Sequence, residues 1–242
     1  MPSWMSVNFQ DFSSSSIFFL IDLHNYVMVI ILIVLFLITY ILVFIFSGVF
    51  YYKFLSEGTL IETIWSLVPA LLLLILVVPS MKVLYWIEDV RGSPFYTFKV
   101  VAHQWYWTYL IPIIEGVCYS FSSNKFFLCE YDSMLVADPD SPRLLSCEES
   151  LLMPVKVSRR LLISSTDVIH SFAIPSLGLK VDAVPGRINQ LLSTPKRVGK
   201  FFGQCSEICG SNHSFMPIRL AVIPFSTYVD STGLLRLEQI LV

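Results

Sequence analysis

The first basic residue of the chain is Lys53, so the 52 residues ahead of it contain neither lysine nor arginine. A secretory signal requires a basic amino-terminal region and a transit peptide is rich in arginine, so we expect neither targeting segment. The tail ahead of the first apolar run carries only Asp11 and Asp22 as charged residues. Because it lacks the positive charge that retains a segment on the cytoplasmic side, we predict that this tail lies on the outer side of a membrane.

Cysteine is scarce, and its number is odd. Five cysteines in 242 residues do not form the framework of a small disulfide-rich domain. Cys118, Cys129 and Cys147 are scattered, and we expect them to be free buried thiols that behave as small apolar groups. Charged residues make up only 14% of the chain, with a net charge of −2, and no nucleic-acid partner is expected.

Long apolar runs are what the sequence has in excess. Val27 to Tyr52 contains 26 residues without a charge, which makes a helix of about 39 Å. Trp65 to Ile87 adds 23 residues, about 34 Å as a helix, and a kink is expected from Pro69 and Pro79 inside it. A buried core helix needs only about 10 to 14 such residues. We therefore predict two membrane spans and a transmembrane hairpin over residues 27–90, behind an outer tail over residues 1–26.

From residue 91 to residue 242, short apolar runs are broken by Pro, Gly, Ser and Asp, a pattern typical of an all-β domain. Many short strands favour a sandwich or barrel over a parallel α/β sheet. The stretch from Glu115 to Glu149 alternates poorly, and we expect an irregular connection with one or two strands. The predicted strands are Thr97–Ala102, Gln104–Ile111, Met153–Ser164, Val168–Ile174, Arg187–Thr194, Lys200–Gln204 and Pro217–Ile223.

The densest chemistry lies between Cys205 and Met216, which read CSEICGSNHSFM and are called the sulfur loop below. Two thiolates, the His213 imidazole and a thioether suit copper in an electron-transfer site on a β-barrel. The second thiolate, from Cys209, permits both sulfurs to bridge two copper ions. Of the other histidines, His170 is the best candidate for a further ligand, because it lies in a predicted strand that ends in a turn.

Two other interpretations of the sulfur loop remain open. Cys205, Cys209, His213 and His170 are a possible zinc set, but structural zinc prefers closer cysteines and has no use for Met216. Alternatively, the Cys-x-x-x-Cys pair is a redox dithiol, as in membrane-anchored copper chaperones. Those proteins have a thioredoxin-like βαβ framework, which the sequence does not display.

The sequence from Gly203 to Pro217 closely resembles the copper loop of cytochrome c oxidase subunit II. Ser164 to Pro185, His103 to Tyr109 and Glu62 to Ala70 look like the same family, in the same order behind two membrane spans. The resemblance implies a Greek-key cupredoxin barrel that holds a binuclear copper centre. It also implies a membrane subunit of the respiratory oxidase. The lack of a signal peptide and of a Cys-x-x-Cys-His haem extension favours the mitochondrial inner membrane, with the barrel in the intermembrane space. A bacterial plasma membrane is the alternative location.

The family resemblance implies a ligand for each position of the centre. Cys205 and Cys209 would bridge both copper ions, and one copper would also take His170 and Met216. The second copper would take His213 and the backbone carbonyl of Glu207. The Glu207 carboxylate would face subunit I and join a magnesium site, for which an oxygen ligand is apt.

The resemblance also implies functional residues outside the copper set. Trp105, in an aromatic run that otherwise resembles an ordinary strand, would receive electrons beneath the surface that binds cytochrome c. Glu62, otherwise a solvated carboxylate at the membrane boundary, would begin a proton path into subunit I, where oxygen is reduced and protons are pumped. Other oxidase subunits and membrane lipid are further expected partners.

Cytochrome c is basic, so its binding face should be acidic. The sequence departs from the family after Tyr109, where Leu110 to Ile114 replaces the usual acidic and tyrosine residues. The acidic excess lies instead between Glu115 and Glu149. The candidate binding residues are Asp138, Asp140, Glu148, Glu149 and Asp167.

Three other classes of protein share parts of this pattern. A copper-delivery chaperone would bind copper transiently, and a nitrous oxide reductase has a similar two-copper loop but needs a far larger catalytic domain. A quinol oxidase subunit has the same architecture without the copper ligands. The sequence therefore favours the oxidase subunit, and another two-copper electron-transfer protein or a chaperone is the alternative.

Overall fold

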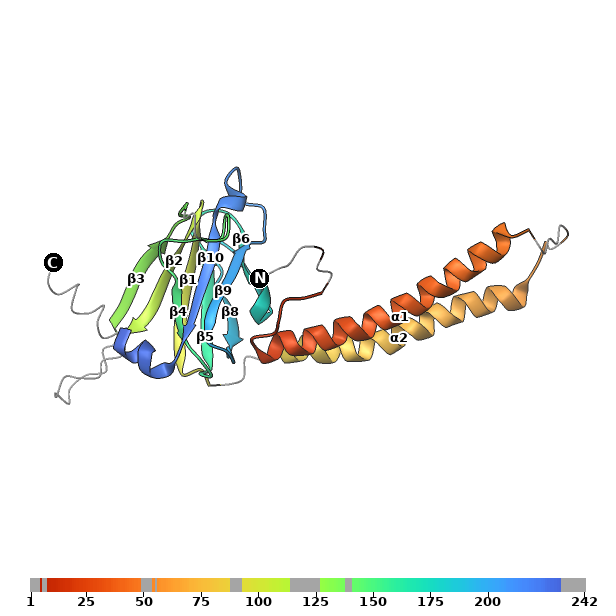
Figure 1. Ribbon diagram of the computed structural model, residues 1–242, viewed down its shortest axis with the longest axis horizontal. Coiled ribbons are helices and arrows are strands. Elements are labelled where there is room, and N and C mark those ends of the chain that lie inside the picture. The colour runs from red at the N-terminus through yellow and green to blue at the C-terminus, as the bar shows by residue number, and fades with distance from the viewer. Residues whose placement is uncertain are drawn as a thin grey trace. The chain divides into compact units, whose positions relative to one another are not determined.

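The computed structural model describes residues 5, 8–48, 54, 56–87, 93–113, 127–137 and 141–231. It divides into two compact units, one made of Met1–Phe18 with Glu88–Val242 and the other of Phe19–Ile87. The first contains a β-domain and the second a helical hairpin (Figure 1).

Two apolar helices form the hairpin, α1 (Ser15–Phe46, 32 residues) and α2 (Thr59–Ile87, 29 residues). At 1.5 Å per residue they are about 48 and 44 Å long, enough to cross a hydrocarbon core of about 30 Å. Their apolar side chains are exposed, as at Phe36 (75%) and Val78 (70%), so they present the surface that lipid covers. The ring centroids of Phe19 and Trp86 lie 4.1 Å apart, which pairs the start of α1 with the end of α2.

The helix bounds differ from the predicted spans. Residues 15–26, assigned from sequence to the tail, are helical, because Ser15–Tyr26 continues the apolar character of the run behind it. The second helix begins at Thr59 rather than Trp65 and is continuous through both prolines. The domain boundaries proposed from sequence remain predictions.

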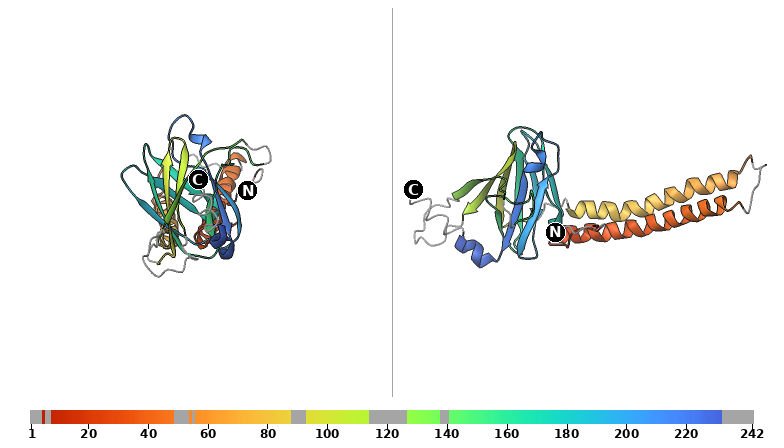
Figure 2. Two further views of the ribbon diagram at one scale, coloured as in Figure 1. Left: turned by 90° about the vertical axis from the view of Figure 1, so that its left-hand side faces the viewer. Right: turned by 45° about the horizontal axis from the view of Figure 1, so that its top comes forward.

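The β-domain consists of two five-stranded sheets that pack face to face (Figures 1 and 2). One sheet has the order β3-β2-β1-β5-β8 and the other β4-β10-β9-β6-β7. The strands are β1 (Tyr96–His103), β2 (Tyr106–Ile113), β3 (Phe127–Ser133), β4 (Leu151–Pro154), β5 (Arg159–Ser165), β6 (His170–Ile174), β7 (Leu179–Ala183), β8 (Asn189–Ser193), β9 (Gly199–Cys205) and β10 (Pro217–Ile223).

The core lies between the sheets because alternate side chains of each strand point inward. Phe98 and Val100 of β1 are fully buried, as are Leu161 and Ile163 of β5. Phe172 of β6 joins the same core cluster from the opposite sheet. The predicted all-β domain is confirmed by this arrangement.

Three strands were not located correctly from sequence. The predicted strand Met153–Ser164 is divided into β4 and β5, which belong to different sheets, with a turn at residues 155–158 between them. β7 was missed because Leu179–Ala183 has a lysine and an aspartate on its exposed positions. β3, by contrast, lies in the segment from Glu115 to Glu149 where one or two strands were expected. The departure after Tyr109 continues β2, where Ile111 is fully buried and pairs with Cys129 of β3.

The segment ahead of α1 is tied to the β-domain. The Ser13 backbone N–H donates to the Ser176 carbonyl (3.0 Å) and the Lys196 N–H donates to the Ser13 carbonyl (2.7 Å). The Ser14 hydroxyl donates to the Leu177 carbonyl at 2.6 Å, and Ile17 is 1% exposed. These hydrogen bonds to the domain fix the chain at the point where it becomes helical.

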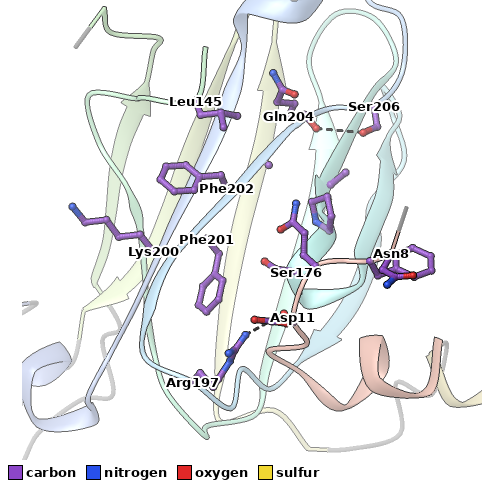
Figure 3. Close-up of a pocket in the computed structure, with 15 residues that line it drawn as sticks. Asn8, Asp11, Leu145, Ser176, Arg197, Lys200, Phe201, Phe202, Gln204 and Ser206 are labelled. Carbon is purple, nitrogen blue, oxygen red and sulfur yellow. Dashed lines mark hydrogen bonds between the residues drawn. The ribbon is translucent and has the colours of Figure 1, made fainter. Parts of the chain in front are cut away.

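A cavity of about 660 Å³ opens between this segment and the outer face of β9 (Figure 3). Arg197 donates to the Asp11 carbonyl and the Ser13 hydroxyl at its edge, and Phe201 and Phe202 are among its lining residues. No cysteine, histidine or methionine of the described residues belongs to its lining, so this cavity is distinct from the sulfur loop.

Gly203 is the position in β9 where a side chain is not tolerated. A Cβ added there would overlap the carbonyl oxygen of Ala173 on the neighbouring strand β6. We predict that Gly203→Ala destabilises the β-domain by about 1–3 kcal/mol, since the strands would have to separate. Thermal unfolding of the full chain in detergent measures this. Gly58→Ala, where nothing lies within 4 Å of the added Cβ, is the control, and equal stability of the two variants would contradict the argument.

Candidate metal centre

The sulfur loop joins β9 to β10 at one end of the sandwich (Figure 1). Cys205 is the last residue of β9, and Met216 immediately precedes β10. His213 begins a short 3₁₀ helix, His213–Phe215. His170 begins β6, which pairs with β9 so that Phe172 lies opposite Cys205. This pairing brings the distant histidine to the loop.

The sulfur atoms and imidazole nitrogens converge. The Cys205 and Cys209 Sγ atoms are 4.0 Å apart. The His170 Nδ1 lies 3.9 Å from the Cys205 Sγ, and the His213 Nδ1 lies 3.5 Å from the Cys209 Sγ. The ligand atoms of His170, Cys205 and Cys209 all fall within 4.8 Å of one another. Such spacing suits groups that share metal ions.

Two further donors from the predicted set lie at the same cluster. The Met216 Sδ is 3.6 Å from the Cys209 Sγ, and Met216 is 1% exposed. The Glu207 carbonyl oxygen is 3.3 Å from the Cys205 Sγ, while the Glu207 residue as a whole is exposed. Two thiols, two imidazoles and a thioether form a soft donor set that fits copper better than zinc, since tetrahedral zinc has no place for the thioether.

Burial and hydrogen bonds make the two thiols unequal. Burial alone would raise the pKa of the Cys205 thiol, but hydrogen bonds from the His170 ring and the Ser171 backbone outweigh it and lower the pKa to about 6. Burial, together with the negative charge on Cys205, raises the pKa of the Cys209 thiol to about 12. At neutral pH the pair therefore carries one thiolate and one thiol in the absence of metal.

Asp167 orients His170, a role that the sequence interpretation missed. Its Oδ1 accepts a hydrogen bond from the His170 Nε2 at 2.8 Å, which turns Nδ1 toward the sulfurs. Burial would raise the pKa of Asp167, but the bond from His170 and the backbone N–H groups of Val168 and Gln104 lower it. A carboxylate on the second nitrogen of a ligating histidine is the usual support of a metal site.

The aromatic residues lie close to the loop. The Trp107 indole N–H donates to the Met216 carbonyl at 3.3 Å. Trp105, in the turn between β1 and β2, is half-buried. A Cβ added at Gly210 would lie 3.1 Å from the Trp105 ring, so this ring covers the residue that follows Cys209. The run of aromatic residues in the sequence indicated that aromatic rings lie near the site. It did not indicate which ring contacts the sulfur loop.

Of the remaining candidate residues, Glu62, Glu148 and Glu149 are not among the converging ligand groups. Glu62 is exposed in the first turn of α2, in the other unit. Glu148 and Glu149 are exposed on the β-domain, and the Glu148 carbonyl accepts a hydrogen bond from Arg219 at 3.1 Å. The predicted binding residues Asp138 and Asp140, and the thiol of Cys118, lie outside the described residues. Cys129 and Cys147 are buried, as expected.

Comparison with known proteins gives consistent relationships along the chain. Residues 96–223 match the family model of the cytochrome c oxidase subunit II periplasmic domain, and residues 2–83 match the transmembrane domain model of that subunit. Cytochrome c oxidase subunit 2 of Apis koschevnikovi is 43% identical over 232 residues, which cover 95% of this chain and 97% of the relative. The Branchiostoma floridae protein of the same name is 41% identical over 213 residues, covering 86% and 87%.

A solved structure resembles the β-domain. It is the periplasmic domain of subunit II of cytochrome oxidase from Bradyrhizobium japonicum, with a TM-score of 0.52 and 35% identity, covering 61% of this chain and 97% of that chain. The family resemblance noted in the sequence and the predicted fold class, two membrane helices followed by a cupredoxin barrel, are confirmed by these matches.

The unequal thiols predict that metal uptake depends on pH. Binding Cu(I) must displace the Cys209 proton, so affinity should rise at least tenfold per pH unit around neutral pH. The rise should be steeper at lower pH, where Cys205 and His170, whose pKa is raised despite its burial, also hold protons. Anaerobic chelator competition with the full chain in detergent at pH 5, 7 and 8 measures the slope.

The matched control for this titration is Cys209→Ser, which removes the proton-releasing thiol and keeps the other three described cysteines, Cys129, Cys147 and Cys205. In this variant, the number of protons released on copper binding, measured as the slope of log affinity against pH, should fall by about one. An affinity for Cu(I) that is independent of pH in the unmodified chain would show that Cys209 is not a ligand.

Proposed function

Since the chain belongs to the cytochrome c oxidase subunit II family and is therefore part of an oxidase, we propose that it takes electrons from cytochrome c at a binuclear copper centre. It passes them to haem a in subunit I, where oxygen is reduced and protons are pumped. The observation that carries this proposal is the convergence of the Cys205 and Cys209 sulfurs with the Nδ1 atoms of His170 and His213. A copper pair in this position would share one electron between two ions.

The chain's own residues would set the conditions for that transfer. Cys205 and Cys209 would bridge the ions, His170 with Met216 would complete one copper, and His213 with the Glu207 carbonyl would complete the other. The buried sulfurs keep water from the centre, and Asp167 holds the His170 ring through its Nε2. A site whose ligands are fixed before electron arrival rearranges little on reduction.

Trp105 is proposed as the residue that receives the electron from cytochrome c. Support comes from its contact with the sulfur loop at Gly210 and from its position at the edge of the β-domain, where it remains partly accessible. A half-buried indole of this kind connects the surface to the residue beside Cys209 without an intervening side chain.

Glu207 is proposed to link the centre to subunit I. Its carbonyl lies at Cys205, whereas the residue is exposed, so its carboxylate is available to a second metal. Magnesium prefers oxygen ligands and shared coordination, which fits a site completed by subunit I.

We place the protein in the mitochondrial inner membrane, as a two-span subunit among other oxidase subunits and lipid, with the β-domain in the intermembrane space. The lack of basic residues ahead of Lys53 supports an outer amino terminus by the positive-inside rule, and an even number of spans returns the β-domain to that side. Glu62, in the first turn of α2 at the opposite membrane surface, is proposed as the start of a proton path into subunit I.

The binuclear centre makes a spectroscopic prediction. The full chain loaded in detergent should hold two copper ions and give a seven-line electron paramagnetic resonance signal in its mixed-valence state, because the unpaired electron is shared by two equivalent nuclei. Metal analysis gives the stoichiometry. One zinc per chain, or one copper with a four-line signal, would instead indicate a structural or chaperone role.

Asp167 has two candidate roles, orienting His170 and binding cytochrome c, and copper binding by variants separates them. As an orienting residue, Asp167→Asn should weaken copper binding roughly 10- to 100-fold. Glu148→Gln, an exposed acid without a ligand contact, should leave copper binding unchanged and slow association with cytochrome c only at low salt, where the charge steers encounter. Copper release and association rates across an ionic-strength series measure both effects.

The same series tests the acidic face itself. Association of the unmodified protein with cytochrome c should slow as salt rises, because screening weakens the attraction between charges. Rates that do not change with salt would exclude an acidic binding face, while leaving the copper assignment untouched.

A further inference from the structure

The turn between β1 and β2, formed by Gln104 and Trp105, contacts the sulfur loop through more than its indole ring. The Gln104 side-chain amide donates to the carbonyl oxygen of Cys209 at 2.8 Å. This carbonyl belongs to the peptide that joins the second cysteine to Gly210. The bond therefore fixes the backbone of the loop at the residue that supplies a sulfur.

The backbone of Gln104 makes a second bond on the other side of the centre. Its N–H donates to the Asp167 Oδ2 at 2.6 Å, while the Asp167 Oδ1 accepts from the His170 Nε2. One residue thereby connects two groups that are far apart in the sequence, the carboxylate that orients His170 and the carbonyl of Cys209.

The contact at Gly210 leaves no spare room. A Cβ there would lie 3.1 Å from the Trp105 ring and 3.3 Å from the Gln104 amide nitrogen, and the φ of Gly210 is +127°, a conformation that favours glycine. The glycine after Cys209 is what allows the turn to approach the loop. The hydrogen bonds and this close approach are independent observations of the same attachment.

We propose that Gln104 is a positioning residue of the copper centre, which holds the sulfur loop and the Asp167–His170 pair in one arrangement beneath Trp105. The inference rests on the proposed function, since it assigns a role toward the copper ligands. Its amide is engaged within the chain, so it acts on Cys209 rather than on an approaching protein. Without the Gln104–Cys209 hydrogen bond, the sulfur loop keeps all its ligand groups but loses one contact that fixes its backbone.

Two substitutions of Gln104 separate positioning from partner binding. Gln104→Leu and Gln104→Glu both remove the amide donor. Neither the apolar leucine side chain nor the ionised glutamate carboxylate can donate a hydrogen bond to the Cys209 carbonyl. Each should release copper about 3- to 10-fold faster, the factor expected for one lost hydrogen bond, and should alter the hyperfine splitting of the copper signal. In both variants the backbone donor to Asp167 remains.

Binding of cytochrome c provides the contrast. If Gln104 acted through the partner instead, the added negative charge of Gln104→Glu would speed association at low salt and Gln104→Leu would not. Gln190→Leu is the matched control, because Gln190 is an exposed glutamine of β8, the edge strand of the sheet that contains β1 and β2. This variant should match the unmodified chain. Gly210→Ala should reproduce faster copper release by crowding the same contact from the loop side.

The measurement is copper release to a chelator, with the electron paramagnetic resonance spectrum, on full chains loaded in detergent. Release within twofold of the unmodified chain, with an unchanged spectrum in both Gln104 variants, would overturn the positioning role while leaving the copper assignment standing. An unmodified chain that holds no copper pair would instead refute the proposed function, and this inference with it.

Discussion

The candidate centre depends on the register between β6 and β9. Phe172 lies opposite Cys205, and Ala173 lies opposite Gln204, so His170 reaches the end of β9 where the first sulfur lies. A slip of one residue would turn every side chain of the strand to the other face. Gly203 permits the close approach of the two strands. The candidate metal ligands from distant parts of the chain are thus brought together by ordinary strand pairing.

Hydrogen bonds between polar groups next to this strand pairing hold one of the candidate ligands, His170, in place. The Asp167 carboxylate accepts hydrogen bonds from Gln104, Ser165, Val168 and His170. It lies in the short connection between β5 and β6, the strands that belong to different sheets. The connection that carries the chain from one sheet to the other therefore also fixes the orientation of a ligand. Rigidity of the fold and geometry of the site have a common source here.

Local patterns in the sequence predict much of this molecule. Apolar length predicts both helices, and alternation predicts most strands, with Pro217–Ile223 predicted at its observed bounds. The ligand types between Cys205 and Met216 indicate a soft metal by their chemistry alone. The division of β4 from β5 escapes such analysis because it depends on which sheet each strand joins. The role of Gln104 escapes it too, because it depends on hydrogen bonds to residues 63 and 105 positions away.

The attachment of the amino-terminal segment constrains how the protein is made. Ser13 is fully buried and bonded to residues 176 and 196 of the β-domain, although the whole membrane hairpin separates these partners in the chain. The domain therefore completes this part of its surface only with residues that precede the hairpin in the sequence. Residues ahead of the hairpin and residues behind it thus belong to one folded unit, although they are synthesised at different times.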